Sequence, residues 1–235
     1  MIKYSSISDR AFTALNLKQY NNLNMPDCLG KMELDVPNED YYILRMLIKN
    51  SLGEYKIPKE LSWVTPLIAR SLHHQDSISV AHSFCYLTIR TKAARTSDAW
   101  HVDGFSTKIT HVPEQNYVWV NKDPTLVATR KFKFPDKFNS RKHNIHQFFQ
   151  ERISDDDFED KGYIYPIEKL NVYCMDPYII HKRPAYVSEG RMFIRVSHTP
   201  IEINDVNNTL NPLIPTNYTR DGIKDFRNTL ERFIN

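Results

Sequence analysis

The sequence has few of the features by which common enzyme classes are recognised. It has only six glycines in 235 residues, and no glycine-rich loop of the kind that cradles phosphates. It contains no G-x-S-x-G segment, the nucleophile elbow of the α/β-hydrolases. Its cysteines show no pair at the spacing of a zinc site. The sequence therefore argues against P-loop nucleotide enzymes, α/β-hydrolases and zinc-binding modules.

Cysteine and long apolar runs are also scarce. The three cysteines, Cys28, Cys85 and Cys174, are far apart and odd in number, which argues against a disulfide framework and predicts free thiols in a reducing compartment. The first residues, MIKYSSISDRAF, lack the apolar stretch of a signal peptide, and no segment approaches the length of a membrane span. We expect a soluble cytoplasmic protein without a membrane partner.

Charge of one sign does not dominate. Lys and Arg number 31 against 28 Asp and Glu, which gives a net charge of +3. A dedicated nucleic-acid binder usually shows a denser basic stripe. The balance permits an anionic substrate without requiring one. We expect a small-molecule substrate, while a protein or nucleic-acid substrate and the oligomeric state stay open.

The hydrophobic pattern predicts one domain over residues 1–235 with a mostly helical part at 1–77. One helix is predicted after Asn38, in EDYYILRMLIKN, because apolar residues crowd a helical pattern behind acids in its first turn. A second runs from Pro58 to about His73, with an interruption or kink at Pro66.

Residues 78–200 change to the pattern of a β-rich core. β-branched and aromatic residues alternate with polar ones in short runs, which predicts an antiparallel sandwich or barrel. The predicted strands are SFCYLTIRT, ITHV, NYVWV, LVATRKFKF, LNVYCM, YIIHK and RMFIRVS.

Two further helices are expected. The first is an insertion at about 140–160, where Ile145, Phe148, Phe149 and Ile153 recur at helical spacing before an acidic loop. The second spans 217–235 and is capped by Thr219.

The chemistry is concentrated in two short segments, WHVDGF and DPYIIH. Residues i and i+2 of a strand project to the same face, so His101 and Asp103 point the same way, and Gly104 lets the chain turn directly afterwards. His181, from a distant strand, would complete a set of two histidines and one carboxylate. Such a set fills one face of an octahedral metal and leaves three positions open.

A strand with two arginines follows His181. In RMFIRVS the residues Arg191, Phe193, Arg195 and Ser197 share one face. Arginines on an inward face are costly to bury unless anions meet them. A dicarboxylate that chelates the metal at one end would supply such an anion.

These motifs resemble the iron(II)/2-oxoglutarate-dependent dioxygenase superfamily, in its phytanoyl-CoA-hydroxylase-like or taurine-dioxygenase-like branch. The resemblance covers about residues 80–200 and rests on His-x-Asp, a distal His and a following Arg. It implies a double-stranded β-helix (a cupin-like jelly roll) with flanking helices. It also implies Fe(II) held by His101, Asp103 and His181, with 2-oxoglutarate as co-substrate and O2 as oxidant. The implied reaction is hydroxylation with release of succinate and CO2.

The resemblance also assigns the co-substrate contacts, with alternatives. Arg191 maps best to the 2-oxoglutarate anchor, which leaves Arg195 for the substrate. The R-V-S tripeptide is also similar to the Arg-x-Ser pair of plant-type members, which would favour Arg195 with Ser197. Thr125 and Tyr117 are the residues we expect for a further polar contact to 2-oxoglutarate.

Other residues have two readings each. Tyr86, Thr88 and Arg90 either line the substrate pocket or form a half-buried strand face. His143 and His146 have ligand-like spacing, but a solvated helix face explains them better. Two rival functions stay open: a cupin-type mononuclear iron enzyme that uses no 2-oxoglutarate, and a catalytically inactive jelly-roll binding module.

Overall fold

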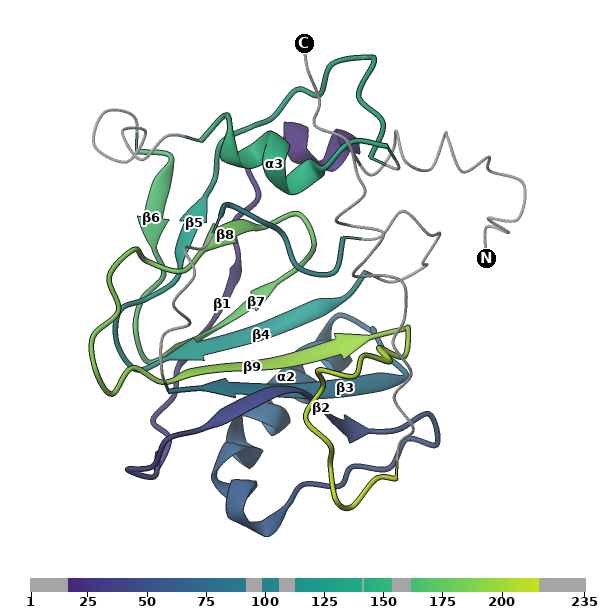
Figure 1. Cartoon of the computed structure of the whole chain (residues 1–235), viewed down its shortest axis with the longest axis vertical. Coiled ribbons are helices and arrows are strands. Elements are labelled where there is room, and N and C mark those ends of the chain that lie inside the picture. The colour runs from purple at the N-terminus through teal and green to yellow at the C-terminus, as the bar shows by residue number, and fades with distance from the viewer. Residues whose placement is uncertain (1–16, 92–98, 106–112, 141, 154–161, 216–235) are drawn as a thin grey trace.

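The computed structural model describes residues 17–91, 99–105, 113–140, 142–153 and 162–215. These residues form two antiparallel sheets, and Figure 1 shows the smaller sheet above the larger one. Apolar side chains from both sheets meet between them, in a cluster that includes Val118, Tyr173 and Phe193 of the large sheet and Val127 and Tyr165 of the small sheet. The expectation of a mainly β protein is confirmed, with two open sheets in place of a closed barrel.

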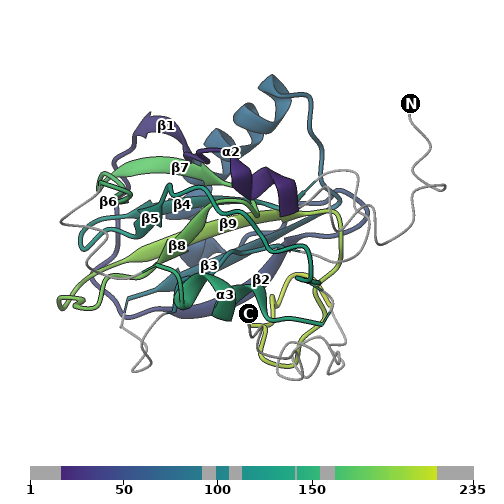
Figure 2. The same cartoon turned by 90° about the horizontal axis from the view of Figure 1, so that it is seen from above.

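The large sheet has six strands, which lie side by side in Figure 2. Their order across the sheet is β1 (Asp27–Lys31), β7 (Asn171–Met175), β4 (Gln115–Val120), β9 (Phe193–Thr199), β3 (Phe84–Arg90) and β2 (Tyr42–Lys49). The small sheet has the order β6 (Ile164–Pro166), β5 (Leu126–Ala128) and β8 (Ile180–Lys182).

Strand β9 divides the large sheet into two chemically different faces. Ile194 and Val196 belong to the main core on the outer face, against helix α2 (Thr65–Ser77). Arg195 alternates with them and therefore faces the small sheet, opposite Val118 of β4 and Thr88 of β3. The alternation read from RMFIRVS therefore separates the residues of the outer core from Arg195, which faces the small sheet.

The helices lie outside the sheets. A 3₁₀ turn, η3 (Lys59–Val64), leads into α2, so the helix predicted over 58–73 is present. Pro66 lies in the first turn of α2, where its missing N–H has no intrahelical partner to lose, and it starts the α-helix in place of kinking it. Helix α3 (Ile145–Gln150) is the predicted insertion, and the Asn144 side chain caps its first N–H groups. Another short turn, η2 (Gln19–Asn21), precedes β1.

The helix predicted in EDYYILRMLIKN is wrong, because this segment is β2. Two register shifts interrupt its pairing with β3, and Arg45, at φ +44°, lies in the first of them. A β-bulge adds one residue to one strand, so Ile43 and Met46 both reach the outer core although they are three apart. The bulge produced a helical spacing of apolar residues within a strand. Within the described residues 17–77, β1 and β2 therefore take the place of part of the predicted helical region.

The remaining predicted elements have mixed outcomes. The runs SFCYLTIRT, NYVWV, LNVYCM, YIIHK and RMFIRVS contain β3, β4, β7, β8 and β9. The run LVATRKFKF is a strand only at Leu126–Ala128, while β1 and β6 were not predicted. The strand ITHV, the acidic loop and the helix at 217–235 with its cap Thr219 lie outside the described residues.

All three cysteines are free thiols, as predicted, with Cys28 exposed and the other two buried. None of the helices in the described part of the chain combines the length and the apolar character that a bilayer crossing requires.

A buried histidine ties α2 to the outer face of the large sheet. His198 of β9 is fully buried, and its Nε2 lies 2.8 Å from the Ser71 Oγ of α2. Burial, with smaller contributions from the neighbouring charges of His82 and Lys49, lowers the pKa of His198 to about 3. The same cause, burial, lowers the pKa of His82.

We predict that His198 makes the fold sensitive to acid. Its pKa in the folded state lies below the ordinary value of about 6.5, so its stabilising effect is present above pH 6.5 and is lost as the pH falls towards 3. The loss is at most about 1.4 kcal/mol per pH unit. Urea unfolding of the wild type and of His198→Gln between pH 7.5 and 4.5 should give free energies of unfolding that converge in acid. Parallel pH curves for the two proteins would contradict this role.

Candidate metal centre

The two histidines of the predicted triad face each other across a single antiparallel bridge. The His101 N–H donates to the His181 carbonyl at 3.0 Å, and the His181 N–H donates to the His101 carbonyl at 2.9 Å. Residues that exchange both hydrogen bonds lie directly opposite, with their side chains on the same face. The two imidazole centroids are accordingly 4.5 Å apart. The backbone pairing alone therefore brings together two ligands that are 80 positions apart in the sequence.

Asp103 completes the set from the same short segment. One potential ligand atom from each of His101, Asp103 and His181 can be chosen so that all lie within 4.8 Å of one another. The Asp103 Oδ2 is 3.4 Å from the His181 Nε2. Two ligand atoms at right angles on one ion are about 3 Å apart when each bond is about 2.1 Å. The three side chains thus lie close enough together to be ligands of a single metal ion. The structure brings together the three residues that the sequence singled out.

Both imidazoles are held in the same orientation by their own backbone. The Nδ1 of His101 lies 2.8 Å from the Ala99 carbonyl, and the Nδ1 of His181 lies 2.9 Å from the Ile179 carbonyl. A carbonyl only accepts, so this network assigns the proton to Nδ1 in both rings. Each Nε2 then keeps its lone pair for a metal, and the second hydrogen bond fixes the ring as in known metal-ligating histidines.

The carboxylate of Asp103 is held in its charged form. Burial by itself would raise its pKa, but the Arg195 guanidinium keeps the pKa well below its ordinary range. A carboxylate must be ionised to bind a metal. Two neutral imidazoles and one carboxylate form a donor set that suits non-haem Fe(II).

The two predicted arginines have different environments. Arg195 forms an ion pair with Asp103 through its Nη1 and the Oδ2 atom. Arg191, ahead of β9, is buried, and its Nε donates to the Asp123 carbonyl at 2.8 Å. Its guanidinium also lies over the Phe193 ring, 5.5 Å from the centroid. Arg195 belongs to the metal centre, and Arg191 lies at the start of the strand.

Ser197 and Thr125 both lie in the interior. Ser197, two residues after Arg195 on the same face, donates to the Asn116 Oδ1 at 2.5 Å. Thr125 is buried directly before β5, where its carbonyl accepts from the Ile167 N–H.

Tyr117 is not brought to the triad. It pairs with Val196 in the register of β4 and β9, and it belongs to the core on the outer face of the large sheet. Its hydroxyl is 2.9 Å from the His74 Nδ1 of α2. Neighbouring residues of a strand face opposite sides, so Val118 faces the small sheet and Tyr117 does not.

The proposed pocket residues of β3 are partly used within the fold. The Tyr86 hydroxyl accepts from the Ile203 N–H at 2.7 Å. Arg90 lies over the Tyr42 ring, with its guanidinium carbon 5.8 Å from the centroid. The reading of these residues as a strand face fits these contacts.

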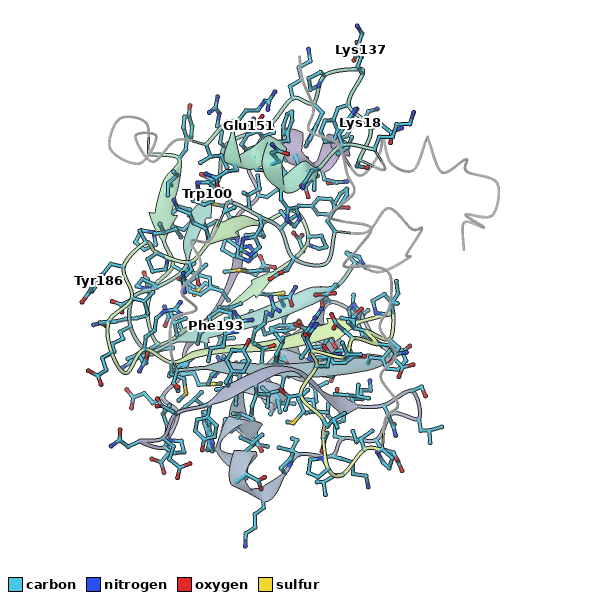
Figure 3. The ribbon with its side chains drawn as sticks, in the orientation of Figure 1. Lys18, Trp100, Lys137, Glu151, Tyr186 and Phe193 are labelled. Carbon is cyan, nitrogen blue, oxygen red and sulfur yellow. The ribbon has the colours of Figure 1, made fainter. Side chains whose placement is uncertain are left out.

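Helix α3 contributes two residues that the sequence did not assign to the site. Gln150 accepts from the Trp100 N–H at 2.8 Å, next to the first ligand. The His146 ring lies 6.2 Å from the His101 ring, whereas His143 accepts from the Asn139 N–H. Trp100 lies near the small sheet and Phe193 on the large sheet in Figure 3. Helical spacing alone gave no signal that one of the two histidines faces a ligand on another segment.

We predict that Gly104 is required for the carboxylate to reach the metal. Its φ is +72°, and a Cβ at this position would lie 2.7 Å from the Cβ of Glu114. Gly104→Ala should lower metal affinity by about tenfold or more, because changing a residue that positions a metal ligand lowers the affinity by about 10–100-fold. Gly53→Ala is the matched control, since Gly53 has φ +81° with nothing within 4 Å of its added Cβ. Both variants should lose about 1 kcal/mol of stability to strain, but only Gly104→Ala should lose affinity in a metal titration. Wild-type affinity in Gly104→Ala would contradict this requirement.

Comparisons with known proteins do not show a family. No family model and no curated protein matches this sequence. Among solved structures, the crystal structure of EvdMO1 is similar at a TM-score of 0.34 and 13% sequence identity. The match covers 83% of this chain and 45% of that chain, so this chain spans less than half of the protein it matches. A likeness of this size carries no argument about function, and the assignment rests on the metal centre itself.

Proposed function

We propose that the chain is a non-haem Fe(II) oxygenase that uses 2-oxoglutarate and O2 to hydroxylate a small substrate, with release of succinate and CO2. The observation that carries the proposal is the convergence of His101, Asp103 and His181 between two antiparallel sheets. Three protein ligands on one face leave three positions of a six-coordinate ion for other ligands. The proposed substrate is a small, anionic or amino-acid-like metabolite, a class that the mild positive charge permits.

The architecture supports a double-stranded β-helix as the finer description of the fold. In this arrangement the large and small sheets would be the two walls of a jelly roll, with α2 and α3 outside. The metal centre lies where β8 meets the segment around His101, and β9 faces it from the other wall.

The roles of the residues follow from their placement. His101 and His181 would hold the ion through Nε2, and Asp103 would hold it through a carboxylate oxygen. Bound Fe(II) would supply the activation of O2, with 2-oxoglutarate as the source of two electrons. The apolar cluster between the sheets, which includes Val118, Val127 and Phe193, excludes water from that side of the centre.

We propose Arg191 as the anchor for the distal carboxylate of 2-oxoglutarate. It is buried, and the Asp123 carbonyl holds its Nε, which orients the guanidinium. Arg195 is already paired with Asp103. The two residues are about 13 Å apart along an extended strand, at roughly 3.3 Å per residue, so one carboxylate would not bridge them without a bend.

The metal assignment predicts the effect of removing each ligand. His101→Ala, Asp103→Ala and His181→Ala should each abolish iron-dependent turnover and lower Fe(II) binding by at least about tenfold, while the thermal unfolding transition stays sharp. His73→Ala, an exposed histidine of α2, is the control and should bind iron as the wild type does. Iron stoichiometry after anaerobic reconstitution is the measurement. Normal iron binding in Asp103→Ala would remove the triad.

The co-substrate assignment predicts the effect of changing Arg191. A planar guanidinium binds a carboxylate with two parallel hydrogen bonds that lysine does not reproduce. Arg191→Lys should therefore raise the KM for 2-oxoglutarate by about tenfold or more, with a smaller effect on the KM for the primary substrate. The assay is succinate formation across a panel of small substrates. An iron-loaded wild type that oxidises a substrate without forming succinate would favour the cupin-type enzyme. A wild type that binds ligands without any turnover would favour the binding module.

A further inference from the structure

Arg195 is the residue through which the large sheet contacts the metal ligands. It lies on β9 between Thr88 and Val118, and its side chain crosses to the segment that carries Asp103. Only 16% of the Arg195 side chain and 27% of the Asp103 side chain are exposed. An ion pair with this degree of burial is less screened than one at the surface. The pair fixes where one oxygen of the carboxylate lies.

The oxygen that Arg195 holds is the one nearest to a second ligand. The Asp103 Oδ2 accepts from the Arg195 Nη1 and lies 3.4 Å from the His181 Nε2. A carboxylate oxygen has two lone-pair directions, so it can bind an arginine with one and a metal with the other. If both oxygens of Asp103 turned towards one ion, Oδ2 would have to leave the direction in which Arg195 holds it.

The number of oxygens that Asp103 gives to the ion decides what else can bind there. Carboxylates bind metals through one or both oxygens. With one oxygen, the two histidines and Asp103 fill three of six positions and leave three. With two oxygens they fill four and leave two. A chelating 2-oxo acid requires two positions, so a third for O2 exists only in the first case.

We propose that Arg195 is a positioning residue that keeps Asp103 a one-oxygen ligand and so preserves the third open position of the ion. This role rests on the proposed function, because it presumes that the triad binds a metal. It differs from the role of Arg191, whose guanidinium is held by the Asp123 carbonyl at the start of the strand.

A second feature of Arg195 agrees with this role. Its Nε is buried and has no hydrogen-bond partner within the part of the chain that the structure describes. Buried donors are almost always satisfied, so this N–H is a donor for an oxygen of a ligand that binds beside Asp103. The guanidinium would then contact Asp103 on one side and the ligand on the other.

The test counts the water molecules on a bound ion. Mn(II) is the probe, because it prefers six-fold coordination with oxygen ligands and its bound waters speed the relaxation of water protons. At saturating protein, the wild type should show a relaxation enhancement equivalent to three waters per Mn(II). Arg195→Gln removes the cation, so Asp103 should bind through both oxygens and the enhancement should fall by about a third. The measurement is made per bound ion, so a change in affinity alone leaves it unchanged.

Two further variants make the outcome decisive. Arg45→Gln is the matched control, since Arg45 forms a half-buried ion pair with Asp205 that includes no metal ligand, and it should keep the wild-type value. Arg195→Lys keeps the charge but offers a compact ammonium in place of the planar fork, so its value should lie below that of the wild type.

The possible results separate this proposal from the metal assignment. A wild-type enhancement in Arg195→Gln would overturn the role of Arg195 while leaving the metal centre intact. If Arg195→Gln releases Mn(II), Arg195→Lys decides: a reduced value supports the proposal, and a wild-type value or a second loss of binding overturns it. A wild-type chain that binds neither Mn(II) nor Fe(II) would remove the metal centre itself, and with it both proposals.

Discussion

The bridge between His101 and His181 is the interaction on which the site depends. Two backbone hydrogen bonds join the residues across the edge of the small sheet. The antiparallel register places their rings on one face, with the ring centroids 4.5 Å apart. The Nδ1 contacts to the carbonyls of Ala99 and Ile179 then set the orientation of both rings. Asp103 lies two residues further along the same segment, in the bend that includes Gly104, and joins them there.

The two sheets contribute different things to the centre. The small sheet, with the segment paired to it, carries the three candidate metal ligands, and the large sheet supplies the compensating charge through Arg195. A buried carboxylate is costly unless a cation or hydrogen bonds meet it. The packing of Val118 and Val127 in one cluster keeps the two layers at the distance that this ion pair requires. Packing and electrostatics therefore stabilise the same arrangement.

The strands and the candidate ligands could be predicted from the sequence wherever a strand is regular. Alternation in the runs of β3, β4 and β9 gave both the strands and the face that carries Arg195, and the i, i+2 rule gave His101 with Asp103. The candidate metal triad could be picked out because metal binding needs particular residue types, which can be recognised in a sequence without knowledge of the fold.

The failures have local physical causes. The bulge at Arg45 in β2 changed the spacing of the apolar core residues from two to three positions. Strand β1 lies at the edge of the sheet, and its residues are too exposed to give an alternating pattern. Tyr117 was expected to contact 2-oxoglutarate, although its neighbour Val118 is the residue that faces the small sheet. The partner of Arg195 and the contacts of Gln150 and His146 depend on how distant segments meet, which no local periodicity records.

The hydrogen bond from Trp100 to Gln150 has a consequence for how such a centre diversifies. The segment of His101 pairs with β8 at one residue only. The N–H of the preceding Trp100 would be left at an open sheet edge if the Gln150 side chain of α3 did not accept from it. Helix α3, which lies outside the small sheet, thereby helps to hold the segment that carries His101. If the triad binds a metal, substitutions along the buried side of α3 would shift that segment and change the environment of the ion, with every proposed ligand left in place.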